Sequence, residues 1–360
     1  MQNSVAHFEI PYTQCLDEAG RAVQGFPEGL RDPATLRALY EVMVRTRAFD
    51  KKAIALQRTG QLGTFASSLG QEAIGAGVGA AMRSEDVLLP SYRDYAAQFS
   101  RGVTMTEVLL YWGGDERGMD YQEPRRDFPI CVPVASHTCH AAGVAFAMKY
   151  RGEARVAVAI LGDGATSKGD FYEAINVSGV WRLPVVFVIN NNQWAISVSR
   201  RAQTAAETLA QKAIAAGIPG EQVDGNDVVA VRERVGAAIE RAREGQGGSL
   251  VECLSYRLGD HTTADDASRY RDLAEVEAAA RRDPIERLRA YLLRADHWSA
   301  ADEEGLLARA AAEVDLAVTG YLASPALPPE SMFDHLYASL PQSLEEQRRA
   351  VAAATDRCLS

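Results

Sequence analysis

Two short polar segments stand where the chain could bind a metal ion and an anion. Gly162-Asp163-Gly164 follows the apolar run 156–161, and Asn191-Asn192 follows the apolar run 185–189. A carboxylate and an amide oxygen are hard ligands of the kind that Mg2+ prefers, and Mg2+ commonly completes its octahedron with phosphate oxygens. The glycines beside Asp163 let the backbone approach a diphosphate. These residue types and their spacing predict a metal-diphosphate site.

The two apolar runs explain how these segments could meet. Each run suits a strand buried on both faces, and Phe171, Ala174, Ile175 and Ser178 recur at helical spacing between them. Strand, helix and strand in this order form a βαβ unit, whose parallel strands end at the same edge of the sheet. If the strands are neighbours, ~5 Å apart, Asp163 and Asn192 can reach one ion. We therefore expect an α/β fold with a doubly wound parallel sheet.

The remaining pattern divides the chain into an N-terminal arm at 1–32, an α/β domain at 33–272 and a helical C-terminal region at 273–360 that packs on the same domain. Prolines and glycines break every run of the arm, which predicts an extended segment on the surface of something larger. In the C-terminal region, residues 275–293 carry helical periodicity. Residues 300–355 are expected to be helical apart from a proline-rich break at 325–329.

Shorter patterns complete the α/β domain. Asp32-Pro33 is typical of a capped helix start, with Leu36, Leu39, Tyr40, Met43 and Val44 on one face of the helix that follows. The small residues of 70–79 predict a helix that packs closely against another backbone. Residues 87–89 and 249–253 read as further short buried strands.

Composition excludes several classes of protein. A formal net charge of -10 over 360 residues argues against a nucleic-acid binder. No window reaches the ~18 apolar residues of a membrane helix, and the N-terminus carries no export signal. The cysteines are an odd set without paired spacing, which fits a reducing cytoplasm: Cys15, Cys131, Cys139, Cys253 and Cys358.

Other motif readings fail or are weaker. A dinucleotide-binding fingerprint would need glycine at position 167, where the chain has Ser167, and a P-loop would need Lys where it has Asp170. A zinc site could be drawn from Cys131, Cys139, His137 and His140, but this cysteine interval matches no common zinc module.

The pairing of Gly162-Asp163-Gly164 with Asn191-Asn192 resembles the thiamine diphosphate motif of transketolases, pyruvate decarboxylases and 2-oxo acid dehydrogenases. Over residues 36–352 the resemblance narrows to the alpha subunit of the decarboxylating component of 2-oxo acid dehydrogenases. The blocks that carry it are Ser68 to Ala73, Tyr92-Arg93, Gly162 to Gly169, Asn191 to Ser197, and Tyr256 to His261 with Asp265-Asp266 and Tyr270-Arg271.

This resemblance implies a set of site residues. Asp163, Asn192 and the carbonyl of Trp194 would bind Mg2+. His261 would be catalytic, beside the diphosphate and the thiazolium. Val134 would be the apolar wedge that bends the cofactor. The remaining expected contacts with thiamine diphosphate are Tyr92, Arg93, Val132, Gly162, Gly164, Ala165 and Ile196.

The chain also departs from the family that it resembles at three places. Branched-chain members have an Arg that touches the diphosphate at the position of Asn190. Their potassium site corresponds to Ser136 and His137, so no potassium is assigned. Animal members carry a regulatory serine at the position of Thr262, so kinase control is not implied.

The resemblance implies oxidative decarboxylation of a 2-oxo acid, with transfer of the acyl group to a lipoyl domain. Pyruvate is the first expected substrate; a branched-chain 2-oxo acid (2-oxoisovalerate) or acetoin remains an alternative. The implied partners are a beta subunit, in a tetramer of two alpha and two beta chains, and a lipoyl-bearing acyltransferase. In this family the beta subunit carries the glutamate that activates the cofactor. A rival of another class, a non-catalytic scaffold subunit, would be expected to lack Asp163, Asn192 or His261.

Overall fold

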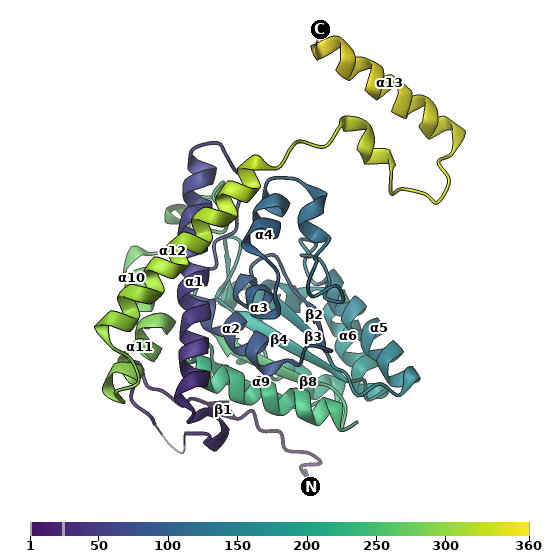
Figure 1. The fold of residues 1–360 in the computed structure, drawn as a ribbon. Coiled ribbons are helices and arrows are strands. Elements are labelled where there is room, and N and C mark those ends of the chain that lie inside the picture. The colour runs from purple at the N-terminus through teal and green to yellow at the C-terminus, as the bar shows by residue number, and fades with distance from the viewer. Residues whose placement is uncertain (1, 24–25, 360) are drawn as a thin grey trace. The chain divides into compact units, whose positions relative to one another are not determined.

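The chain is described by a computed structural model that covers residues 2–23 and 26–359 (Figure 1). It forms two compact units, Met1–Val318 and Thr319–Ser360. The first unit contains the sheet and all the residues expected at the site. The predicted division of the chain at residues 32 and 272 stays a prediction, and both positions fall inside this first unit. No helix of the described residues is long and apolar enough to cross a membrane.

The first unit is built on a six-stranded parallel sheet with the order β1-β7-β8-β4-β3-β2. Its strands are β1 (Tyr12–Thr13), β2 (Val87–Leu89), β3 (Ala157–Gly162), β4 (Val185–Asn191), β7 (Gly220–Asp224) and β8 (Ser249–Leu254). β3 and β4 are direct neighbours, with Gly162 opposite Asn190. The predicted strands and the predicted βαβ unit are therefore confirmed.

Helices cover both faces of this sheet (Figure 1). The helices are α1 (Pro33–Arg58), α2 (Glu72–Ala81), α3 (Tyr95–Arg101), α4 (Met105–Trp112), α5 (Ser136–Arg151), α6 (Gly169–Val180), α7 (Arg200–Gln203), α8 (Lys212–Ala216) and α9 (Val228–Arg243). Alternate residues of β3 divide between two cores: Val158 and Ile160 pack with α1, α2 and α9, whereas Ala159 and Leu161 pack with α5 and α6. This is the doubly wound α/β arrangement that the sequence predicts.

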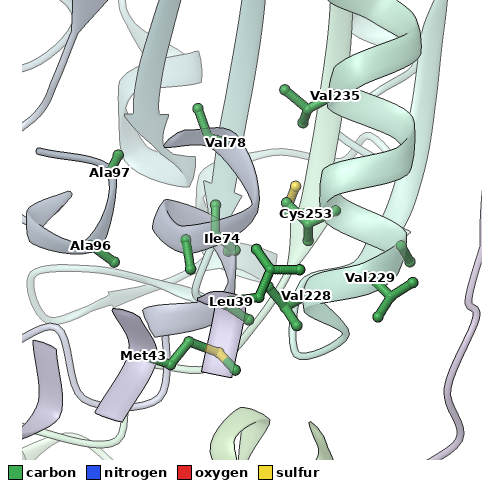
Figure 2. Packing of buried hydrophobic residues seen from close by; sticks show 14 of the residues in the cluster. Leu39, Met43, Ile74, Val78, Ala96, Ala97, Val228, Val229, Val235 and Cys253 are labelled. Atoms are coloured by element: carbon green, nitrogen blue, oxygen red, sulfur yellow. The ribbon is translucent and has the colours of Figure 1, made fainter. Parts of the chain in front are cut away.

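The small residues of α2 allow the close packing that was expected. Ile74 and Val78 lie among side chains from α1, α3 and α9 (Figure 2). A Cβ added to Gly77 would lie 2.6 Å from the Val231 side chain of α9, and one added to Gly75 would lie 2.9 Å from Ala96. Only glycine fits at these two crossings.

The N-terminal arm is partly built into the sheet. Tyr12 and Thr13 form β1, which pairs with β7, so the arm contributes a strand that its broken pattern did not predict. The Asp227 carboxylate accepts hydrogen bonds from the backbone N–H groups of Cys15 and Leu16, each at 2.6 Å. These bonds tie the arm to the N-terminus of α9.

The C-terminal helices differ from the expected pattern in two places. Residues 275–293 are not one helix: α10 (Leu273–Ala280) ends before α11 (Pro284–Arg294), because Pro284 has no N–H to donate and Asp283 caps the new helix. After α12 (Ala300–Ala323), the break runs to α13 (Gln342–Leu359), with only a 3-10 turn at Pro329–Phe333. The break is therefore longer than the predicted 325–329.

Candidate functional site

The loops that leave the carboxyl ends of four strands enclose one cavity. β2 leads to Tyr92 and Arg93, β3 to Asp163, β4 to Asn192, and β8 to His261. The cavity and its open mouth together contain about 800 Å3 of empty space. Open α/β sheets bind their ligands at this edge.

Nearly all of the residues expected at the site line this cavity. They are Tyr92, Arg93, Val134, Gly162, Asp163, Gly164, Ala165, Asn192, Trp194, Ile196 and His261. Val132 does not line it and is 50% exposed. The structure thus brings together segments that are up to about 170 residues apart in the sequence, from Tyr92 to His261.

Asp163 is a buried carboxylate with one amide donor. It is 2% exposed, and its Oδ2 accepts a hydrogen bond from Gln203 Nε2 at 2.9 Å. Burial raises the pKa of Asp163 to about 6, an effect that the Gln203 hydrogen bond only partly opposes. A bound cation would stabilise the charged form, so this environment fits a metal ligand.

Asn192 and Asn191 have different surroundings although they are adjacent. Asn192 lines the cavity, donates from Nδ2 to Gln71 Oε1 at 2.8 Å and accepts the N–H of Trp194 at Oδ1, at 3.2 Å. Asn191 donates to the buried Glu252 at 2.6 Å and does not line the cavity. Of the motif's two asparagines, only Asn192 is available to a ligand there.

Two buried guanidinium groups make the cavity positive. Arg93 donates to the carbonyl oxygens of Ser67 and His261, and Arg257 donates to those of Trp194 at 3.3 Å and Ile196 at 2.7 Å. Among the described residues neither forms an ion pair with a carboxylate, unlike the buried Arg101, Arg243 and Arg287. Burial, followed by the charge of Arg93, lowers the pKa of Arg257 to about 10. An anionic ligand would balance this charge.

His261 lies between these two arginines. Its Nδ1 is 3.4 Å from Arg93 and 3.5 Å from Arg257, and its ring packs edge-on against Tyr92. Burial, then the two positive charges, lower the pKa of His261 to about 4. The imidazole is therefore neutral near pH 7 and has a nitrogen that can accept a proton.

The segment after His261 supports its position. Asp265 accepts hydrogen bonds from the backbone N–H of His261, at 2.9 Å, and from the hydroxyl of Tyr270. Tyr270 in turn accepts from Arg257 at 2.9 Å. Asp265 thus positions the histidine loop and is more than the solvated loop residue that a polar Asp-Asp pair suggests.

A hairpin carries two of the expected residues to the mouth of the cavity. β5 (Trp194–Ala195) and β6 (Val198–Ser199) are antiparallel, and Ile196 in their turn has a φ of 55°. This conformation is strained for a β-branched residue and is held by the hydrogen bond from Arg257 to the Ile196 carbonyl. Ile196 is 55% exposed and Val134 is 43% exposed, which leaves an apolar rim.

The two glycines beside Asp163 have different surroundings. A Cβ added to Gly162 would meet nothing within 4 Å, whereas one added to Gly164 would lie 2.6 Å from the side chain of Ala195. Gly162 therefore leaves open space at the end of β3, and Gly164 is needed for contact with the hairpin. Together with the unpaired arginines, this arrangement fits an anion such as a diphosphate.

The structure does not support the zinc alternative. In the part of the chain that the structure describes, no group of three or more His, Cys, Asp or Glu residues is placed to hold a metal ion. His137 instead donates from Nε2 to the carbonyl of Ile160 at 2.8 Å. A magnesium site with a single carboxylate is compatible with this finding, because phosphate oxygens complete such sites.

Several residues that line or support the cavity were not predicted. Arg257 and Gln71 fall inside sequence blocks that carry the family resemblance. The blocks indicated that these segments lie near the site, but not which of their side chains face the cavity. Asn190 and His137 line the cavity and were noted only as departures from the family. Gln203 comes from α7 and has no sequence signal.

Comparison with known proteins is consistent with this geometry. A family model described as "Dehydrogenase E1 component" matches residues 40–330. The chain is 42% identical over 325 residues to the 3-methyl-2-oxobutanoate dehydrogenase subunit alpha of Mycobacterium tuberculosis, covering 89% of each chain. It is 39% identical over 351 residues to the pyruvate dehydrogenase E1 component subunit alpha of Staphylococcus aureus, covering 96% of this chain and 94% of that one. The corresponding subunit of Mycoplasma genitalium is 36% identical over 343 residues, with 95% and 96% covered.

The matched region includes every residue of the cavity. Family membership implies the use of thiamine diphosphate, and the naming of the relatives as alpha subunits implies a partner beta subunit. The chain belongs to the dehydrogenase E1 component family, as an alpha subunit of the decarboxylating component of a 2-oxo acid dehydrogenase.

Proposed function

We propose that the cavity holds the diphosphate of thiamine diphosphate through Mg2+. Asp163 and Asn192 supply side-chain oxygens to the metal, and Trp194 supplies its carbonyl. The observation that carries this proposal is that one buried carboxylate and two buried guanidinium groups line the same cavity, and that within the described chain neither guanidinium forms an ion pair with a carboxylate. Such a site accepts a metal ion and an anion together.

When bound, thiamine diphosphate supplies a carbanion that attacks the 2-oxo carbon and an electron sink for the loss of CO2. This chain's own residues bind and orient the group. Arg93 and Arg257 balance the charge of the diphosphate, and the exposed rim of Val134 and Ile196 covers its apolar part. His261 is neutral near pH 7, so its free imidazole nitrogen can take up a proton and return it.

The site needs a second chain to be complete. Activation of the aminopyrimidine requires a carboxylate, and of the described residues that line the cavity Asp163 alone is acidic. Asp163 is committed to the metal, so we propose that the beta subunit contributes the missing carboxylate. We further propose an assembly of two alpha and two beta chains, which passes the acyl group to a lipoyl-bearing acyltransferase. The cytoplasmic location expected from the sequence stays a prediction.

The proposed reaction is the oxidative decarboxylation of a short 2-oxo acid, with pyruvate first. The Staphylococcus aureus and Mycoplasma genitalium relatives are named for pyruvate. The second candidate is 3-methyl-2-oxobutanoate, because the Mycobacterium tuberculosis relative carries that name at 42% identity. Acetoin has no such support. A scaffold subunit is disfavoured, because Asp163, Asn192 and His261 line one cavity.

Reconstitution with the beta subunit tests the proposal. We expect the complex to decarboxylate pyruvate with a higher kcat/KM than 3-methyl-2-oxobutanoate, and we expect this chain alone to show no turnover with either acid. The reverse substrate preference would favour the second candidate. Turnover by the isolated chain would contradict the proposal that a partner supplies the missing carboxylate.

A further inference from the structure

Gln71 contacts both asparagines at the end of β4. It is 3% exposed, lies at the N-terminus of α2 and lines the cavity. Its Oε1 accepts hydrogen bonds from Asn190 Nδ2 at 3.0 Å and from Asn192 Nδ2 at 2.8 Å. A single buried oxygen thus links α2 to the proposed metal ligand Asn192.

One backbone group fixes how these amides are oriented. The N–H of Trp194 can only donate, and it donates to Asn192 Oδ1 at 3.2 Å. The Nδ2 of Asn192 must then face Gln71, and the atom of Gln71 that meets it must be the acceptor Oε1. The same oxygen receives Asn190, whose Oδ1 accepts from the hydroxyl of Ser255 at 2.8 Å.

This orientation leaves the other end of the Gln71 amide unsatisfied. Its Nε2 is buried and finds no hydrogen-bond partner among the residues that the structure describes. Buried donors are normally paired, and an unpaired one needs a compensating role. Gln71 lines the same cavity as Asp163 and Arg93, where the proposed ligand brings phosphate oxygens. A phosphate oxygen could accept the hydrogen bond that Gln71 Nε2 has available.

We infer that Gln71 is a further cofactor-binding residue with two functions. Its Oε1 holds the amide of Asn192 with Oδ1 turned away from Gln71, and its Nε2 donates to an oxygen of the bound diphosphate. This inference rests on the proposed function and adds a contact to it. It also gives a structural role to Asn190, whose Nδ2 donates a second hydrogen bond to the Oε1 of Gln71.

The test is the substitution Gln71→Glu in the complex with the beta subunit. Glutamate has the same size and still accepts from both asparagines, but it replaces the donor by an anionic oxygen. We expect the Kd for thiamine diphosphate at saturating Mg2+, measured by calorimetry, to rise at least tenfold. Gln71→Met, which removes both functions, should weaken binding in the same direction.

A buried glutamine elsewhere provides the matched control. Gln98 in α3 is 1% exposed, donates to the Tyr121 hydroxyl at 2.9 Å and does not line the cavity. We expect Gln98→Glu to leave the Kd unchanged. The thermal midpoint of each complex without cofactor reports separately on folding.

The outcomes distinguish this inference from the function on which it rests. If the wild-type complex binds thiamine diphosphate and the Gln71→Glu complex binds it equally well, the inference is overturned and the proposed function stands. The inference would also be overturned if Gln71→Met raised the Kd for thiamine diphosphate and Gln71→Glu did not, because the Nε2 donor would then contribute nothing to binding. A wild-type complex that binds no cofactor would overturn the proposed function and the inference together.

Discussion

The surroundings of His261 shift its pKa away from the ordinary value of a histidine. Burial and the charges of Arg93 and Arg257 lower its pKa to about 4, and Asp265 opposes them only weakly. A bound diphosphate would offset the two positive charges and raise this pKa. The proposed proton-transfer residue would therefore be coupled to cofactor binding through electrostatics.

This coupling predicts how stability depends on pH without cofactor. Below pH 6.5 the unfolded chain protonates its His261, whereas the folded chain does so only near pH 4, so folded stability is lost as the pH falls across this interval. We expect wild type to lose about 1 to 2 kcal/mol more than His261→Gln between pH 7 and pH 4.5, after allowance for partial exposure. Denaturant unfolding at both pH values measures the difference. Parallel pH dependence of the two proteins would contradict the lowered pKa.

Sequence reasoning finds some site residues and misses others for a physical reason. Asp163 and Asn192 stand in motifs whose position at strand ends follows from periodicity, and His261 was expected from the family resemblance. The orientation of Gln71, Arg257 and Gln203 depends on which hydrogen bonds form after folding, and residue type alone does not determine that. Val132 lies between Cys131 and Val134, which line the cavity, but does not line it itself, so its contact with the cofactor stays a prediction.

Among the secondary-structure elements, α2 sets the position of Gln71 in the site through its packing against neighbouring helices. It carries Gln71 at its N-terminus and packs against α3 and α9 through glycines. Any widening of that contact would move Gln71 relative to Asn192. The packing of α2 and the geometry of the site are therefore linked.

A pair of glycine substitutions tests this packing. We expect Gly77→Ala to destabilise the chain by about 1 to 3 kcal/mol, because the new methyl group would lie 2.6 Å from Val231. Gly143→Ala, within α5, should instead stabilise it by about 0.5 to 1 kcal/mol, since a Cβ there meets nothing within 4 Å. Thermal or denaturant unfolding measures both. Equal effects of the two substitutions would show that close packing is not the reason for glycine in α2.

Some helices and strands can be predicted from the local sequence pattern, whereas others depend on contacts with distant residues. The buried strands β3 and β4 and the capped start of α1 follow from local pattern, and all three were predicted. The short strand β1 was missed because it depends on pairing with β7, more than 200 residues away. The break between α10 and α11 could have been read from Asp283-Pro284. The β5-β6 hairpin is held by contacts from Arg257 that no local pattern reveals.

At the scale of the whole molecule, we propose that the cavity is half of a site shared with the beta subunit. Its inner end is polar and buried around Asp163, whereas its mouth exposes Val134 and Ile196. The inner end fits the proposed metal ion and diphosphate. Under this proposal the beta subunit completes the wall at the open mouth, so the substrate would depend on both chains.

The central claim is that Asp163 holds the cofactor through Mg2+, and binding measures it most directly. Calorimetric titration of the complex with thiamine diphosphate and Mg2+ should show saturable binding for wild type. It should also do so for Asp170→Ala, a control on α6 outside the cavity lining. For Asp163→Ala we expect the Kd to rise at least a hundredfold at the same Mg2+ concentration, equivalent to about 2.7 kcal/mol or more. An Asp163→Ala complex that binds thiamine diphosphate and Mg2+ as tightly as wild type would contradict the account.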